Sequence, residues 1–154
     1  MLIKLQPQHI PLLNSLFDKI IDTGDFEYFH PHPFTTEQAE QICNYTGKDL
    51  YLASIDNGKI SSYGLLRGWD EGFLAPSLGI YVEETYRGTG LSKRTMEELQ
   101  DFAWKNGSKR IRLTVLTKNK KALALYQNMG YTLYKKYHNY VVLFIYNPLL
   151  KREY

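Results

Sequence analysis

The stretch from Ser77 to Gly107 constrains the fold most, because it reads as a strand, a glycine turn and a helix. An apolar run at residues 78–82 precedes the turn at residues 87–90, and apolar residues at helical spacing follow it. The first amides of a helix have no partner inside it, and the helix dipole makes that end positive. Glycines let the backbone approach an anion closely. The stretch therefore predicts a phosphate-binding turn between a strand and a helix.

The turn does not match the common nucleotide fingerprints. Lys93 stands where the dinucleotide motif G-x-G-x-x-G needs its third glycine, and no Walker lysine lies at the required offset. A nucleotide-binding α/β domain that binds NAD or ATP is nevertheless one alternative for a turn of this kind.

A second motif lies downstream, at residues 119–131, and together the two resemble the GNAT superfamily of acyl-CoA-dependent N-acyltransferases. The pyrophosphate loop of that family, R/Q-x-x-G-x-G/A, is matched by Arg87, Gly90 and Ser92. Its next motif, N-x-x-A-x-x-L-Y-x-x-x-G-F, is matched by Asn119, Ala122, Leu125, Tyr126, Gly130 and Tyr131. Ser92 for glycine or alanine and Tyr131 for phenylalanine are the departures. The resemblance covers about half the chain.

Composition fits one domain over residues 1–154, with a hydrophobic content of 44% and no sign of disorder. The one cysteine, Cys43, cannot form an intramolecular disulfide and is expected to be a small buried side chain rather than a nucleophile. No signal peptide or membrane span is expected, which indicates the cytoplasm. A net charge of +3 does not indicate nucleic-acid binding. Basic residues cluster between Lys105 and Lys121, as a solvated face or as a field for a polyanionic cofactor.

Hydrophobic periodicity and turn signals predict an α/β chain with antiparallel strands first. The expected order is strand 2–5, helix 11–23, helix 36–46, strands 50–55, 60–69 and 77–82, helix 91–106, strand 110–116, helix 119–129, and strands 132–137 and 140–146. The strands on either side of the glycine turn should run parallel, because a helix joins them. The resemblance implies a GNAT-like mixed, centrally splayed β-sheet flanked by about four helices, with the acyl-pantetheine arm between the splayed strands.

The resemblance also implies acetyl-CoA as cosubstrate. The residues expected to bind it are Ile80, Tyr81, Val82, Arg87, Gly88, Thr89, Gly90, Leu91, Ser92 and Asn119. Asn119 fits either a pantetheine contact or a helix cap. Tyr126 matches the general acid that protonates the departing thiolate, although helical spacing alone favours a core aromatic. A phenol of pKa about 10 is a reasonable donor to a thiolate whose acid has a pKa of about 8.5.

The segment from Asp25 to Phe34 combines four aromatic residues with two prolines and two histidines, which excludes a regular helix. One interpretation is an acceptor-binding loop in which Phe29, His30 and His32 contact the substrate; the other is packing over the core. His-Pro-His as a metal site is a third option, but no acidic or cysteine partner lies at a usual spacing, so we expect no metal. The general base is not identified; Glu83, Glu84 and the two histidines are candidates.

The sequence thus predicts an acyltransferase, an acetyl-CoA-dependent N-acetyltransferase. The expected acceptor is a primary amine of a small molecule, such as an amino sugar, attacking directly in a ternary complex. Alternatives are a protein N-terminal or lysine acetyltransferase and a non-catalytic acyl-CoA-binding regulatory module. The expected partner is a small-molecule amine, with no nucleic acid and no membrane, and the chain is expected to act as a monomer or homodimer.

Overall fold

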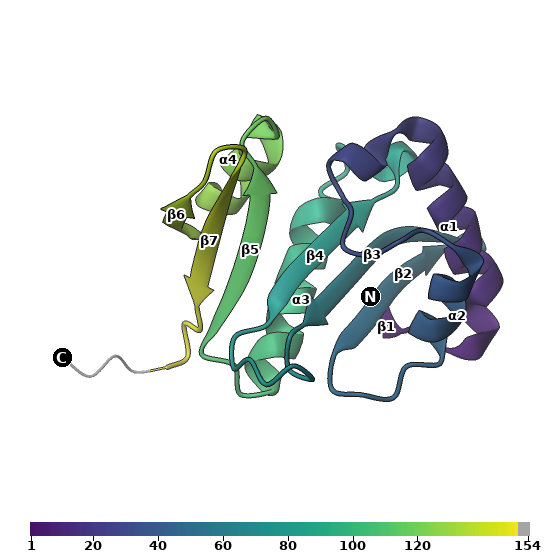
Figure 1. Cartoon of the computed structure of the whole chain (residues 1–154), viewed down its shortest axis with the longest axis horizontal. Helices are drawn as coiled ribbons and strands as arrows, with labels where there is room; N and C mark the ends of the chain where they lie inside the picture. The colour runs from purple at the N-terminus through teal and green to yellow at the C-terminus, as the bar shows by residue number, and fades with distance from the viewer. Residues whose placement is uncertain (151–154) are drawn as a thin grey trace.

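The computed structural model describes residues 1–150, which form a seven-stranded sheet with helices on both faces (Figure 1). The strands are β1 (Ile3–Lys4), β2 (Leu50–Asp56), β3 (Lys59–Arg67), β4 (Ser77–Val82), β5 (Arg110–Leu116), β6 (Thr132–Lys136) and β7 (Tyr140–Tyr146). The α-helices are α1 (Ile10–Thr23), α2 (Thr36–Cys43), α3 (Leu91–Lys105) and α4 (Lys120–Asn128). Short 3₁₀ helices, η1 (Pro7–His9), η2 (Asp25–Glu27) and η3 (Glu84–Tyr86), lie between them. The predicted order of strands and α-helices is confirmed.

Local sequence signals explain where several elements begin and turn. The Thr35 hydroxyl accepts a hydrogen bond from the Gln38 amide at 3.1 Å, which caps α2. Asn57 and Gly58 both have positive φ, 49° and 72°, and close the hairpin between β2 and β3. This turn type twists in the same sense as the strands it joins, and asparagine followed by glycine favours it.

The sheet has the order β1-β2-β3-β4-β5-β7-β6, and every pair is antiparallel except β4 with β5. Within the described residues, β4 and β5 are in register at one pair, Ser77 with Arg112. Beyond that pair the two strands diverge towards their carboxyl ends, as Figure 1 shows. The predicted central splay is therefore confirmed, and it leaves main-chain groups of both strands without ladder partners.

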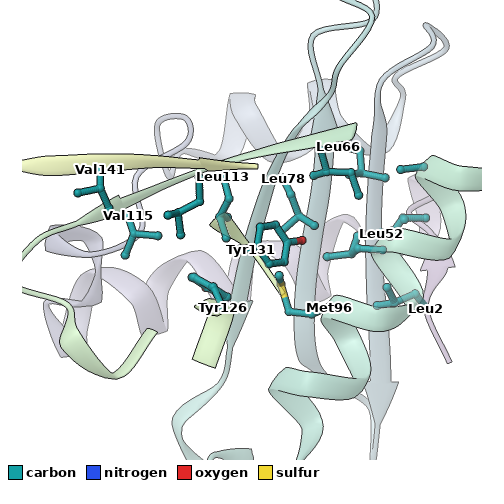
Figure 2. Close-up of a cluster of buried hydrophobic side chains, with 14 residues drawn as sticks. Leu2, Leu52, Leu66, Leu78, Met96, Leu113, Val115, Tyr126, Tyr131 and Val141 are labelled. Carbon is teal, nitrogen blue, oxygen red and sulfur yellow. The ribbon is translucent and has the colours of Figure 1, made fainter. Parts of the chain in front are cut away.

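Buried side chains gather in two clusters, one on each face of the sheet. The first lies under α3 and α4, where Met96, Leu113 and Tyr131 meet (Figure 2). The second lies under α1 and α2 and includes Phe17 and Tyr63. Strand residues supply the clusters alternately, as the pleat requires. Over β5 and β7, in the described part of the chain, helices cover only the α4 side (Figure 1).

Among residues 1–150, no helix is both long enough and apolar enough to cross a lipid bilayer.

Gly64 allows α3 to pack closely on β3, and replacing it should destabilise the protein. A Cβ at this position would lie 2.7 Å from both terminal methyl groups of Leu99, which is fully buried. We expect Gly64→Ala to lower the free energy of unfolding by about 1–3 kcal/mol through overpacking. Urea denaturation monitored by circular dichroism measures the change.

A double-mutant cycle tests whether this contact is the cause. Leu99→Ala alone should cost about 2–5 kcal/mol, because it leaves a cavity. The new methyl group of Gly64→Ala would fill part of that cavity, so the double variant should lose clearly less than the sum of the two single losses. Additive losses would show that the Gly64–Leu99 contact does not limit packing.

Candidate active site

A cleft of about 860 Å³ opens where β4 and β5 diverge. Its walls come from β4, β5, the glycine turn, η2 with the two residues after it, and α4 with the loop that precedes it. The predicted site residues that line it are Ile80, Tyr81, Val82, Arg87, Gly88, Ser92, Asn119, Tyr126 and Phe29. Thr89, Gly90 and Leu91 complete the same turn just outside the lining. The structure thus brings together residues from both halves of the sheet.

The glycine turn forms one end of the cleft and leads directly into α3. Gly88 and Gly90 have φ values of 79° and 84°, and Gly90 is the N-cap of the helix. The Arg94 amide bonds back to the Gly90 carbonyl at 3.2 Å. The amides before it at the helix start have no carbonyl one turn back within the helix, so they are available to an anion. Apart from the adjoining backbone, no atom of residues 1–150 lies within 4 Å of where a Cβ at Gly88 or Gly90 would be, which leaves room for a phosphate to approach.

Several basic residues line the cleft. Lys118, Lys120 and Lys121, from the start of α4 and the loop before it, line the cleft together with Arg87. Lys118 reaches across to η2, with its Nζ 3.8 Å from a Glu27 carboxylate oxygen. A cluster of positive charge beside exposed amides is complementary to a polyanion such as a pyrophosphate.

Arg87 also ties the glycine turn to the segment after α1. Its guanidinium lies 2.7 Å from Oδ2 of Asp25, and its Nε donates to the Val82 carbonyl at 3.0 Å. The Tyr81 hydroxyl donates to the same Asp25 oxygen at 2.7 Å. Burial raises the pKa of Asp25, but the bonds from Tyr81 and Arg87 outweigh it and hold that pKa below its usual value. Asp25 is therefore an ionised wall of the cleft.

Tyr126 lies on α4, and its ring belongs to the first core cluster (Figure 2). The residue also lines the cleft. It is 8% exposed, and its ring centroid is 6.0 Å from that of Tyr131. Burial raises the pKa of Tyr126 to about 12, so the phenol is protonated at neutral pH. Among residues 1–150 its hydroxyl has no hydrogen-bond partner. The core and cleft interpretations of Tyr126 are thus compatible.

Asn119 lies at a position that fits both of its predicted roles. Its Oδ1 accepts from the Ala122 amide at 3.3 Å, which caps α4. The residue also lines the cleft. Contact with a pantetheine arm stays a prediction.

The aromatic segment from Asp25 to Phe34 contributes Phe29 to the lining of the cleft, whereas His32 does not line it. Phe29 rests against β4, where a Cβ at Gly79 would lie 3.7 Å from its ring. His32 packs against Phe17, and its Nδ1 donates to the Pro33 carbonyl at 2.8 Å. Its Nε2 therefore accepts from the Tyr63 hydroxyl at 2.9 Å.

His30 is exposed, with a ring nitrogen 3.1 Å from the Phe26 carbonyl, and neither histidine lines the cleft. An acceptor contact by His30 or His32 stays a prediction, and the geometry of His32 fits the packing interpretation. The described residues contain no group of three His, Cys, Asp or Glu side chains that could hold a metal.

Glu83, one of the candidate general bases, has structural partners, and Cys43 is buried. The buried Glu83 carboxylate lies 2.6 Å from Lys19 Nζ and accepts from the Thr85 amide at 2.9 Å. Burial raises the pKa of Glu83, but these bonds outweigh it and lower that pKa, which disfavours a general base. Burial raises the pKa of the Cys43 thiol to about 11. This agrees with the expected small buried side chain.

Asp25 is the site residue that sequence reasoning missed. It follows the helix stop at Gly24, so it reads locally as an ordinary turn residue. Its partners Tyr81 and Arg87 are 56 and 62 residues away in the sequence. No local pattern could have joined them.

The sequence signature of the Acetyltransferase (GNAT) family matches residues 17–131 of this chain. The match covers strands β2 to β5, the glycine turn and α4. The chain therefore belongs to the GNAT acetyltransferase family, whose members transfer acetyl groups from acetyl-CoA.

A thialysine N-epsilon-acetyltransferase of Sus scrofa is 39% identical over 51 residues, which are 33% of this chain and 30% of that protein. The chain matches about a third or less of the length of such curated relatives. A GNAT-family acetyltransferase from Streptococcus pneumoniae superposes with a TM-score of 0.78 at 20% identity, covering 96% of this chain and 99% of the other. A ribosomal-protein-alanine N-acetyltransferase from Brucella melitensis superposes with a TM-score of 0.77 at 13% identity, covering 96% of this chain and 99% of the other. These superpositions establish the fold alone.

The glycine turn should be required for acetyl-CoA binding. We expect Gly90→Asp to weaken that binding at least tenfold, because it adds a carboxylate where phosphate must approach. Gly107→Asp is the matched control: Gly107 has a φ of 83°, close to the 84° of Gly90, and lies at the other end of α3 with equally open space around it. Both variants carry the same backbone strain, but only Gly90→Asp should lose affinity in calorimetry. Equal affinities in folded protein would contradict a phosphate-binding turn.

His32 should make stability depend on pH. Burial lowers the pKa of His32 from 6.5 to about 4, so the unfolded chain takes up the proton first as pH falls. The contribution of neutral His32 to the free energy of unfolding is fully present above pH 6.5 and is lost progressively as the pH falls to 4. We expect about 2 kcal/mol of the loss between pH 7 and pH 5.

Urea unfolding of wild type and His32→Gln at both pH values isolates this contribution, because glutamine does not titrate. The variant should be less stable at pH 7 and should show a smaller decrease at pH 5. The same decrease in both proteins would mean that His32 is not the group that titrates.

Proposed function

We propose that this chain transfers an acetyl group from acetyl-CoA to a primary amine of a small molecule, such as an amino sugar, by direct attack in a ternary complex. The observation that carries the proposal is a cleft that runs between β4 and β5 with different chemistry on the two faces of the sheet. Tyr126 belongs to the face covered by α3 and α4, whereas Phe29 and Asp25 belong to the face covered by α1. Two substrates can therefore approach one point from opposite sides.

The glycine turn and its neighbouring cations would hold the donor. The amides at the start of α3 and the positive end of its dipole suit the pyrophosphate, with Lys120 and Lys121 adding charge. Main-chain groups of Ile80 to Val82 that face β5 lack strand partners there, so they can bond the pantetheine arm. The main-chain amides of Ile80 to Val82 are also the candidate donors to the oxyanion that develops at the thioester carbonyl.

Tyr126 would donate to the departing sulfur. Full transfer from a phenol of pKa about 12 to the thiolate of an ordinary thiol, pKa about 8.5, is uphill. A buried site also disfavours the charged thiolate and therefore raises the pKa of the thiol. This narrows the difference between the pKa of the phenol and that of the thiol. A hydroxyl without another partner then stabilises the developing negative charge by a hydrogen bond and supplies the proton as the bond breaks.

Deprotonation of the acceptor favours an amine of low pKa. Asp25 lines the cleft, but its Oδ2 is held by Tyr81 and Arg87 and its pKa is lowered, so it is a weak base. A lysine amine of pKa about 10.4 costs about 4.6 kcal/mol to deprotonate at pH 7, whereas an α-amine near 7.8 costs about 1.1 kcal/mol. An acceptor of low pKa can lose its proton to water.

A protein N-terminus is the second candidate acceptor, because its amine also has a low pKa and one structural neighbour is named for acetylating a ribosomal protein alanine. A lysine side chain fits less well on the same argument. A non-catalytic acyl-CoA-binding role would not need the Tyr126 hydroxyl in the cleft. A cytoplasmic location is proposed on the basis of the lone, buried cysteine.

Tyr126→Phe should keep the fold and acetyl-CoA affinity but lower kcat. Loss of the hydroxyl removes the donor to the thiolate, which we expect to cost about 10²- to 10⁴-fold in rate. This corresponds to about 3–5 kcal/mol of barrier. The ground-state complex carries no thiolate charge, so acetyl-CoA affinity should hardly change. Single-turnover rates of acetyl transfer, calorimetric affinity and melting temperature on one preparation measure all three.

Tyr131→Phe is the matched control. Tyr131 is the neighbouring buried tyrosine, and its hydroxyl donates to Gln100 Oε1 at 2.9 Å rather than facing the cleft. Its loss should lower the melting temperature and leave the single-turnover rate nearly unchanged. A near-normal single-turnover rate in Tyr126→Phe would remove Tyr126 from the mechanism.

A further inference from the structure

A second hollow, of about 1030 Å³, lies on the uncovered face of β5 and β7, beside the loop that joins β3 to β4. Ile111 and Leu113 of β5 point into the core under α3 and α4. Strand side chains alternate between faces, so Arg110 and Arg112 point to the opposite face, where they line the hollow. We call this hollow the basic groove.

Among residues 1–150, the charged side chains that line the basic groove are all positive. Its charged lining residues are Lys109, Arg110, Arg112 and Lys135, and no described residue of the lining is acidic. None of these four cations forms an ion pair with another residue in the range 1–150. Cations that share a hollow without a carboxylate repel one another, and a bound anion relieves that repulsion.

Aromatic rings form the floor of the basic groove. The Arg110 guanidinium lies over the Phe144 ring at 4.2 Å, and the Tyr134 ring meets Phe144 edge-on at 5.1 Å. Phe144 is 7% exposed as a result. Stacking orients the guanidinium, and an apolar floor strengthens its bonds to an anion. A guanidinium so placed suits a carboxylate or phosphate, which it can bind with two parallel hydrogen bonds.

The basic groove adjoins the active-site cleft. Thr114 lines the cleft, Val142 lines the groove, and the two residues are direct partners across β5 and β7. Arg112 is two residues before Thr114 on the same face, a step of about 7 Å along a strand. A molecule whose amine lies in the cleft on this face can therefore extend into the groove.

We propose that the basic groove binds an anionic group of the acceptor, so that the substrate class is a primary amine that also carries a phosphate or carboxylate. Arg112 is the specificity-determining residue, since it lies nearest the cleft and is exposed. Arg110, held on Phe144, extends the site away from the reacting amine. This inference rests on the proposed function, because it assigns the part of the acceptor that the cleft does not hold.

The test compares acceptors that differ only by an anion, with saturating acetyl-CoA and release of free CoA as readout. Glucosamine 6-phosphate against glucosamine tests phosphate. Alanyl-glutamate amide against alanyl-glutamine amide tests carboxylate in a nearly isosteric pair. At least one anionic member should show a kcat/KM at least tenfold above its neutral partner, the effect of one charge-assisted bond. The pair that shows it identifies the anion.

Arg112→Gln should remove that preference and leave kcat/KM for the neutral member within about twofold of wild type. Lys136→Gln is the control, because it removes the same charge from β6 outside the groove and should keep the preference. Equal kcat/KM for both members in wild type, or equal losses for both in Arg112→Gln, would overturn the proposal.

A binding measurement separates failure of this inference from failure of the proposed function. The chain has two tryptophans, and Trp69 lines the groove, so a Trp104→Phe variant reports on the groove by fluorescence. It is titrated with glucosamine 6-phosphate and with alanyl-glutamate amide in the presence of CoA. Saturable binding that Arg112→Gln abolishes supports the anion site even if no amine is acetylated, a result that would count against the proposed function alone. No binding in either titration overturns the anion site.

Discussion

The limited pairing of β4 with β5 is the constraint on which the rest of the site depends. In the part of the chain that the structure describes, they are in register only at Ser77 and Arg112, while β3 holds β4 and β7 holds β5 over most of their lengths. Each strand is thus fixed from its outer side, and the divergence survives because neither strand can turn towards the other. Full pairing would satisfy the main-chain groups and leave no passage between the faces of the sheet.

The fold also separates the cationic residues of the late chain into two groups. The sequence reads as one basic cluster between Lys105 and Lys121, interpreted either as a solvated face or as a field for a polyanion. In the folded protein the cluster separates. Lys118, Lys120 and Lys121 line the cleft beside the glycine turn, whereas Arg110 and Arg112 line the basic groove on the uncovered face of β5. Alternation along one strand and the turn at its end are enough to produce two separate basic environments.

The elements with local signals could be predicted from sequence. The glycine turn lies where predicted, and the Thr35 cap and the Asn57-Gly58 hairpin likewise depend on residues only a few positions apart. The parallel central pair followed from the helix between its strands. The position of β7 between β5 and β6 could not be read from the sequence, because it depends on which sheet edge the last hairpin joins.

The site residues likewise differ in whether local sequence is enough to identify them. Residues that match a family motif, such as Arg87 and Tyr126, could be assigned to the cleft from the resemblance. Asp25 could not, because its role arises from partners more than fifty residues away. His32 shows the converse limit: its chemistry suggested a binding loop, but packing against Phe17 and a bond to Tyr63 decide its position. Composition cannot show which side of a loop faces the protein.

The contact of Phe29 with β4 has a consequence for the evolution of acceptor size. Gly79 has no side chain, and a Cβ there would lie 2.0 Å from the Leu65 Cδ1 and 3.7 Å from the Phe29 ring. Any larger residue at position 79 would displace Leu65, and a side chain longer than that of alanine would also press on the Phe29 ring. Because the nearest atoms to this position belong to Leu65 and Phe29 rather than to the glycine turn or α4, the proposed acceptor side of the cleft could be widened or narrowed separately from the proposed donor side. A family that keeps one donor and changes acceptors can diversify by single substitutions at such a point.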